Sequence, residues 1–464
     1  MTPPIVIILN ALLIHISEQK EYNTKLRHYQ SRRADYNMRA MENFRRSALN
    51  LGERYLKTDL QYLAREGSWL SVGQAYALLS GLALSIIFAK ILPREVYGNY
   101  KYVLSIGGML AGLGLTGLTS AVIQAVAKGY TGTLESAKNT YLKWGLIILG
   151  LSAIGSIYYL LQNNYFLAIS LFIAGVSIPV SGAYNLYGSY LYGLKSFRPA
   201  TIFWIIGQTL SITLLIGAGY FISNAISLVL AYYLSQIIIA VGFFKYTLRK
   251  HEVSGPSDAS LLSYGKHISI MNLLGTLANQ LDKVLVFHYL GAAQLALYTF
   301  AFAIPEQIKG TYKNLFQIAL PKYADQDPNK IRNSILDKIK RLTLITALLV
   351  VGYCLTAPLI YRLLFPAYQD AVFYSQIYML GMIAIPGISL FGTYFQVRKD
   401  TKTLYKLSVI SNLSTIVLTF VLISRFGLLG AVIENGISWF LILAIYIYYF
   451  HKDKPTNLGV GSPS

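Results

Sequence analysis

The residues of this chain best suited to chemistry are charged side chains that lie inside long apolar stretches. A charge in membrane hydrocarbon costs at least ~2.5 kcal/mol, so each one needs a partner or a water-filled cavity. Such groups form buried ion pairs, bind anions or carry protons. They are Lys90, Lys101, Lys143, Asp282, Lys283, Glu306, Lys309, Lys313 and Glu434.

The deepest of these charges lie on two stretches that a short turn joins. Glu306, Lys309 and Lys313 share one helical face, at spacings of i, i+3 and i+7. Folding the chain back at the turn brings Asp282 to within one turn of Glu306. The sequence therefore predicts a salt-bridged polar cluster between the two stretches, with Asn279 on the same face as Asp282.

This cluster has two readings. It is either a structural ion pair or an anion-binding and proton-sensing group in a water-filled cavity, and two lysines against one glutamate on one face favour the second. Lys90, Lys101 and Lys143 lie near the ends of their stretches, where a long side chain can reach the interface instead.

Several other kinds of site are not indicated. The six histidines never reach ligand spacing with each other or with the single cysteine, Cys354, so we expect no metal. No phosphate-binding loop is present, and no cofactor is expected. Residues 112–117 match GxGxxG, but they lie inside a predicted spanning helix without a preceding strand, so we expect them to serve helix packing.

The elements that must position these residues are membrane spans. The chain has 464 residues, 54% of them hydrophobic and only 13% charged, about half the charged fraction of soluble proteins. We predict an all-α integral membrane protein with twelve spans. The predicted spans are 68–92, 100–126, 140–161, 165–192, 199–218, 221–244, 263–290, 295–320, 340–361, 371–397, 404–424 and 427–450.

The distribution of Lys and Arg sets the orientation. Twenty of them lie in or beside connections on the side of the amino terminus, against three on the other side, Arg94, Arg362 and Arg425. The positive-inside rule then places both termini in the cytoplasm. This placement also argues against a nucleic-acid partner, which the net charge of +20 would otherwise suggest.

The domain organisation follows from the spans. We predict a cytoplasmic extension at 1–66 with a short amphipathic helix near 47–63, and two six-span lobes at 67–245 and 263–450. A central cytoplasmic loop at 246–262 joins the lobes, and 451–464 is predicted to be a disordered tail. At an offset of 198 residues, Leu92 matches Leu290, Tyr100 matches Tyr298 and Ile106 matches Ile304, which indicates an internal repeat.

The first hairpin, with Phe88-Ala89-Lys90-Ile91-Leu92-Pro93-Arg94-Glu95-Val96-Tyr97-Gly98-Asn99-Tyr100, resembles that of Wzx-type oligosaccharide flippases of the MOP superfamily. Leu281-Asp282-Lys283-Val284-Leu285, Leu297-Tyr298 and Leu364-Phe365-Pro366-Ala367-Tyr368 resemble later parts of the same family. The resemblance covers about residues 66–450. It implies two pseudo-symmetric six-helix bundles, and a carrier of undecaprenyl-diphosphate-linked glycans in the inner (cytoplasmic) membrane.

The resemblance also implies a cationic cavity. Its substrate-binding residues would be Lys90, Lys101, Lys283, Lys309 and Lys313, and its coupling residues Asp282, Glu306 and Glu434. Whether H⁺ or Na⁺ is coupled stays open, and the expected partners are the lipid-linked glycan and membrane lipids. The alternative is an ion-coupled multidrug antiporter of the same superfamily, which would favour deep acids. A glycan polymerase or ligase is disfavoured because the predicted outer loops are short, so we expect no enzyme.

Overall fold

The computed structural model describes residues 60–251, 253, 255–324, 328–398 and 400–452, with side chains at these positions except 60–67, 311–334 and 401. Every regular element in this part of the chain is a helix. The predicted tail beyond residue 452, most of the predicted extension and nearly all of its amphipathic helix lie outside the described residues. Residues Trp69–Ser464 form one compact unit, and the contacts below lie within it.

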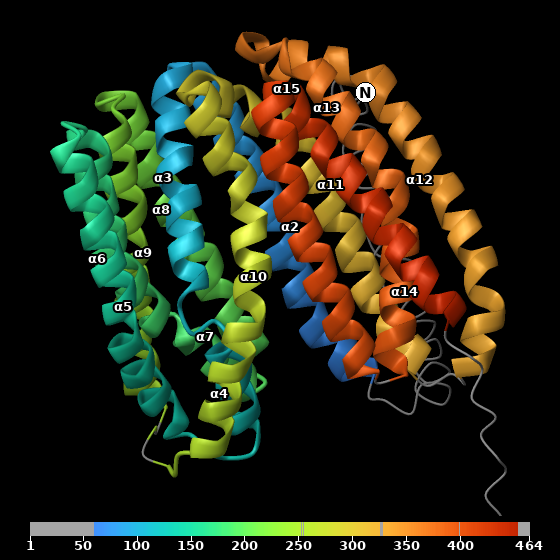
Figure 1. Ribbon diagram of the computed structural model, residues 1–464. Coiled ribbons are helices and arrows are strands. Elements are labelled where there is room, and N and C mark those ends of the chain that lie inside the picture. Colours follow the sequence, from blue (N-terminus) through green and yellow to red (C-terminus); the bar gives the residue numbers. More distant parts are fainter. Residues whose placement is uncertain (1–59, 252, 254, 325–327, 399, 453–464) are drawn as a thin grey trace, which may run out of the picture. The chain divides into compact units, whose positions relative to one another are not determined.

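The first half of the chain supplies a set of long helices and short partners (Figure 1). These are α2 (Leu60–Ile91), α3 (Arg94–Gly112), α4 (Leu118–Ala127), α5 (Thr133–Leu161), α6 (Tyr165–Tyr184), α7 (Leu186–Gly193), α8 (Phe197–Phe221) and α9 (Ala225–Lys250). Pro93 precedes α3, where its fixed φ suits a helix start and its missing N–H costs nothing. The helix therefore begins earlier than the span predicted at residue 100.

The second half of the chain is also built of helices. Its helices are α10 (Ala259–Leu290), α11 (Ala292–Ala324), α12 (Pro328–Leu364), η1 (Pro366–Tyr368), α13 (Ala371–Gly381), η2 (Met382–Ala384), α14 (Ile385–Val397) and α15 (Thr401–Lys452). Within α15 the backbone of Gly427 leaves the helical region (φ 58°), so the element consists of two helical arms. Asp258 caps α10, and hydrogen bonds from Ser260 and the Leu261 amide hold its pKa below the ordinary value.

The protein is a multi-pass membrane protein. Among the described residues, eight helical stretches are long and apolar enough to cross a bilayer, and the last of them is Lys402–Lys452 within α15. Helices α3, α10 and α11 are not among these stretches. They carry the charges Lys101, Asp282, Lys283, Glu306 and Lys309.

The glycine motif at 112–117 does not lie inside a continuous helix as predicted, because α3 ends at Gly112 and α4 begins at Leu118. Its packing role is confirmed. A Cβ on Gly117 would lie 2.2 Å from the carbonyl oxygen of Gly265, and one on Gly112 would lie 2.7 Å from a methyl carbon of Thr276. The Gly117 amide also donates to Ser269 Oγ at 2.8 Å. Only glycine lets this segment approach α10 so closely.

The two halves share an aromatic core next to the start of α3. Tyr97 stacks on Phe300 with ring centroids 4.6 Å apart, and a Cβ on Gly98 would lie 1.8 Å from the carbonyl oxygen of Ala292. Tyr100 and Tyr298, which the repeat predicts to be equivalent, are both buried in this core. We call this contact between α3 and the second half the Arg94-side layer.

Candidate functional site

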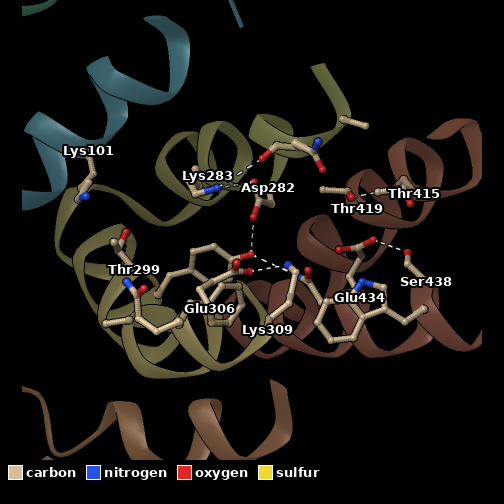
Figure 2. Close-up of a pocket in the computed structure, with 18 of the residues that line it drawn as sticks. Lys101, Asp282, Lys283, Thr299, Glu306, Lys309, Thr415, Thr419, Glu434 and Ser438 are labelled. Atoms are coloured by element: carbon tan, nitrogen blue, oxygen red, sulfur yellow. Dashed lines mark hydrogen bonds and ion pairs between the residues drawn. The ribbon is translucent and has the colours of Figure 1, made fainter. Parts of the chain in front are cut away.

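A polar cavity of about 390 Å³ borders the Arg94-side layer. Its lining residues come from both halves of the chain, from α2 and α3 and from α10, α11 and both arms of α15. Figure 2 shows Lys101 of α3 together with charged residues of α10, α11 and α15. The charged side chains in its lining are Lys101, Asp282, Lys283, Glu306, Lys309 and Glu434. Three cations thus face three carboxylates.

Asp282 is held from a neighbouring helix by a phenol. Tyr298 of α11 donates its hydroxyl to Asp282 Oδ2 at 2.7 Å, and Asn435 of α15 donates to the same hydroxyl oxygen at 3.4 Å. Lys283 pairs with Asp282 at 3.5 Å and also donates to the carbonyl of Asn279 at 3.4 Å. The long distances and the two acceptors leave the Lys283 ammonium weakly held.

The second carboxylate belongs to a tighter group. Lys309 Nζ lies 2.7 Å from Glu306 Oε1 and 3.1 Å from the Tyr378 hydroxyl, which itself donates to Glu306. The ammonium also lies 5.1 Å from the ring centroid of Trp439. The predicted polar cluster between α10 and α11 is present, but its salt bridges lie within each helix, and the described link between the two helices is the hydrogen bond from Tyr298 to Asp282. Each acid pairs with a lysine on its own helix and accepts a hydrogen bond from a tyrosine.

Glu434 differs from the other two acids. It is only 3% exposed, although it contributes to the cavity lining. Its Oε1 accepts a hydrogen bond from Ser438 at 2.5 Å, one turn further along α15. Among the described residues no salt bridge reaches it. A buried carboxylate without a cation is costly, and this sets Glu434 apart from the two paired acids.

Lys101 is the cation that the first half contributes. In the described part of the chain it makes no salt bridge, and its ammonium rests 5.3 Å from the ring centroid of Tyr97 and 6.0 Å from that of Tyr100. Aromatic faces stabilise a cation without neutralising it. Lys101 therefore presents an unneutralised charge to the cavity.

Three other predicted or weighed residues are placed differently. Lys90 is exposed near the end of α2 and does not line this cavity. Its position one residue before the helix end lets it extend towards the interface. Lys143 is exposed on α5 and does not line this cavity either. The side chain of Lys313 lies outside those described, so the structure does not place it.

The Arg94-side layer closes one end of the cavity, because Tyr97 both lines the cavity and stacks on Phe300. Arg94 adds a bidentate contact to Asp370, with N–O distances of 2.8 and 3.1 Å, and donates to the carbonyl of Ala367. This contact joins α3 of the first half to the η1–α13 turn of the second half.

The sequence did not identify the residues that organise the acids. Tyr378 and Trp439 lie far in the chain from the Glu306–Lys309 pair that they contact. Ser438 lies one turn from Glu434, but uncharged hydroxyl residues are common in spans, so nothing marked it. Tyr298 carried a signal as a matched position of the repeat. In the described part of the chain no group of three or more His, Cys, Asp or Glu residues could hold a metal ion.

Known proteins share this architecture. The model of a polysaccharide biosynthesis protein family matches residues 87–372, more than half of the chain, and the model of the lipid II flippase MurJ matches residues 312–461. No curated protein sequence matches the chain.

Solved structures of low sequence identity have the same fold. The lipid II flippase MurJ in an inward closed conformation gives a TM-score of 0.66 at 15% identity, covering 82% of this chain and 87% of that one. An inward-facing multidrug MATE transporter of the MOP superfamily gives 0.61 at 17% identity, covering 81% and 94%. A MOP superfamily transporter from Pyrococcus furiosus gives 0.55 at 16% identity, covering 84% and 95%. The chain therefore belongs to the polysaccharide biosynthesis protein family, and its fold is that of MOP superfamily transporters.

Proposed function

We propose that this protein flips a lipid-linked oligosaccharide from the cytoplasmic to the outer leaflet of the cytoplasmic membrane, for surface polysaccharide biosynthesis. It acts as a transporter and not as an enzyme. The family match and the flippase and transporter folds support this proposal. The observation that carries it is the polar cavity lined by both halves, in which an unneutralised lysine lies near two lysine–carboxylate pairs.

The part of the substrate that this cavity binds is the diphosphate, as the family resemblance implies. Lys101 supplies a charge that no carboxylate takes up in the described structure. The side chains of Lys283 and Lys309 are 29% and 34% exposed, so both ammonium groups can turn from their carboxylates to phosphate oxygens. Ammonium groups bind phosphate as point charges, which suits a lipid diphosphate that enters in more than one pose.

Alternating access between the two lobes is the mechanism that we propose. A cavity of about 390 Å³ is near the lower end for small-molecule sites, so it holds a diphosphate and its nearest sugar better than a whole glycan. Opening must therefore separate the lobes. The Arg94-side layer would separate on the outer side, and Glu434, Asp282 and Glu306 would take up the coupling proton or cation.

We also propose the topology and the domain division. Twelve spans cross the membrane, six in each lobe at 67–245 and 263–450, with both termini and the loop at 246–262 in the cytoplasm. Reporter fusions after Lys250 and Lys402 are then expected to report cytoplasm, and one within residues 291–294 to report the outside. A cytoplasmic signal at 291–294 would overturn this topology.

The function is tested in a strain that lacks the gene. Lipid-linked glycan is expected to accumulate on the cytoplasmic face of its membrane, and surface polysaccharide is expected to be lost. Expression of the intact chain should restore both. The alternative, an ion-coupled drug antiporter, is favoured instead if the deletion strain makes normal polysaccharide but becomes sensitive to cationic drugs.

A further inference from the structure

A second cavity of about 390 Å³ lies away from the first and shares no residue with it. It is lined by Thr140, Lys143, Trp144 and Ile147 of α5 and by Lys266 of α10. Two lysines from helices of different halves thus share one hollow. Their arrangement calls for an explanation because like charges repel unless an anion lies between them.

Neither lysine has a protein partner in the described structure. Both side chains are exposed, and neither makes a hydrogen bond, a salt bridge or a contact with an aromatic ring among the described residues. Lys138, further towards the start of α5, differs, because its ammonium lies 5.5 Å from the ring centroid of Phe244. The pair in the cavity is therefore available to an external anion.

The depth of the cavity matches the headgroup region. Along α5, the exposed large apolar side chains begin at Trp144 and continue to Leu161, whereas Glu135, Lys138 and Asn139 come before them. The exposed face of α5 thus changes from polar to apolar beside the cavity. Trp144 is fixed there by a hydrogen bond of 2.8 Å from Nε1 to the carbonyl of Leu113. Tryptophan at such a boundary is typical of a membrane interface.

We propose that this cavity binds the phosphate headgroup of an anionic membrane phospholipid. Two ammonium groups offer a phosphodiester complementary charge, while Ile147 and the exposed apolar face of α5 beyond it can line the adjoining acyl chain. A zwitterionic headgroup would bring its own cation close to Lys143 and Lys266, so it fits worse. Basic pockets between spanning helices at the cytoplasmic side commonly take anionic headgroups.

Such a lipid would join the two halves of the protein. It would touch α5 of the first half and α10 of the second. Trp144 bonds to Leu113 at the α3–α4 break, and the amide of Gly117 in the same break donates to Ser269, on α10 shortly after Lys266. Because the bound lipid contacts both sides of this junction, it is expected to stabilise the described conformation by mass action.

The test uses the purified full chain in an uncharged detergent. Phosphatidylglycerol, phosphatidylcholine or inorganic phosphate is titrated in, and bound lipid is measured by native mass spectrometry alongside the melting temperature. We expect phosphatidylglycerol alone to bind at low concentration and to raise the melting temperature. Lys143→Gln and Lys266→Gln should each weaken its apparent affinity about fivefold, and the double variant about thirtyfold, because each basic residue near an anionic lipid contributes roughly that factor.

Two matched variants complete the test. The control is Lys245→Gln. Lys245 is exposed near the C-terminal end of α9 and lines neither cavity, so this change should leave lipid affinity unchanged. The double Arg variant should keep the affinity, because it keeps both charges. Equal affinity of the double Gln variant and the parent chain for phosphatidylglycerol would overturn the proposal. So would equal binding of phosphatidylcholine, or binding of inorganic phosphate as tight as that of the lipid.

Discussion

The hairpin of α2 and α3 and the hairpin of α10 and α11 are matched parts of the two halves, and they differ in where they place charge. At the offset of 198 residues they agree where they touch. Tyr100 and Tyr298 are both buried, and Gly98 matches Ala296, so a small residue lies at this position of each hairpin. These positions belong to the Arg94-side layer, where the two halves pack together.

The hairpins disagree where they face the cavity. Positions Asp282, Lys283, Glu306 and Lys309 correspond to Leu84, Ser85, Gly108 and Ala111 in the first hairpin. In the opposite sense, the charged Lys101 corresponds to the neutral Thr299. The two hairpins therefore share the residues that pack against each other but not the charged residues that line the cavity. The hairpin of α10 and α11 carries the paired acids and bases of the cavity, and the hairpin of α2 and α3 carries Lys101.

The largest effect is expected where the hairpins touch. Gly98→Val would place a branched side chain where even a Cβ lies 1.8 Å from the Ala292 carbonyl oxygen. Backbone cannot move aside as a side chain can, so the folded state should lose about 3 kcal/mol or more. A large fall in melting temperature and in yield would show this. Gly150→Val is the matched control, because nothing lies within 4 Å of its Cβ position on α5. Equal tolerance of the two variants would contradict the close approach.

The free cation of the first hairpin gives the next effect. Lys101→Gln should lower the transport rate about tenfold to a hundredfold at normal expression, because a hydrogen bond to a charged group contributes about 1.5–3 kcal/mol. Lys101→Arg should recover part of the activity. Lys90→Gln, outside the cavity, should transport at the parent rate. The measurement is the transport rate in vesicles at matched protein levels. Equal losses in the Lys90 and Lys101 variants would contradict the role of the cavity in binding substrate.

The matched tyrosines sharpen the comparison further. Tyr298→Phe removes the hydroxyl that donates to Asp282, and it should cost about 2 kcal/mol of stability. Tyr100→Phe should cost much less, because the Tyr100 hydroxyl makes no hydrogen bond within the described residues. Thermal unfolding of the two variants side by side measures the difference. A Tyr100 variant as unstable as the Tyr298 variant would contradict this difference between the two tyrosine hydroxyls.

The smallest effect is expected at the pair on α11. Lys309→Gln leaves Glu306 with only its Tyr378 partner, which should cost about 1 kcal/mol because the pair is more than one-third exposed. Adding Glu306→Gln should restore stability but not transport, because Lys309 is proposed to bind phosphate oxygens directly. Recovery of transport in the double variant would instead show that the pair is only structural.

Much of this plan could be predicted from the sequence. The repeat offset identified Tyr100 and Tyr298, and helical spacing identified the pair of Glu306 with Lys309, because both depend on local periodicity. The links from Tyr378 and Trp439 to the α11 pair could not be predicted, since they depend on how distant helices pack. The break at residues 112–117 was also missed, because glycines inside an apolar run read equally well as a packing face or as a helix end.

Flipping by the purified protein is the most direct test of the proposed function. Purified protein is placed in vesicles with a fluorescent undecaprenyl-diphosphate oligosaccharide, and glycan on each face is followed with a glycosidase added outside. We expect protein-dependent flipping that an unlabelled lipid-linked glycan inhibits and a cationic drug does not inhibit. We also expect Lys101→Gln to slow it at least tenfold. Vesicles in which the glycan stays on its original face while the protein exports a cationic drug would contradict the proposed function.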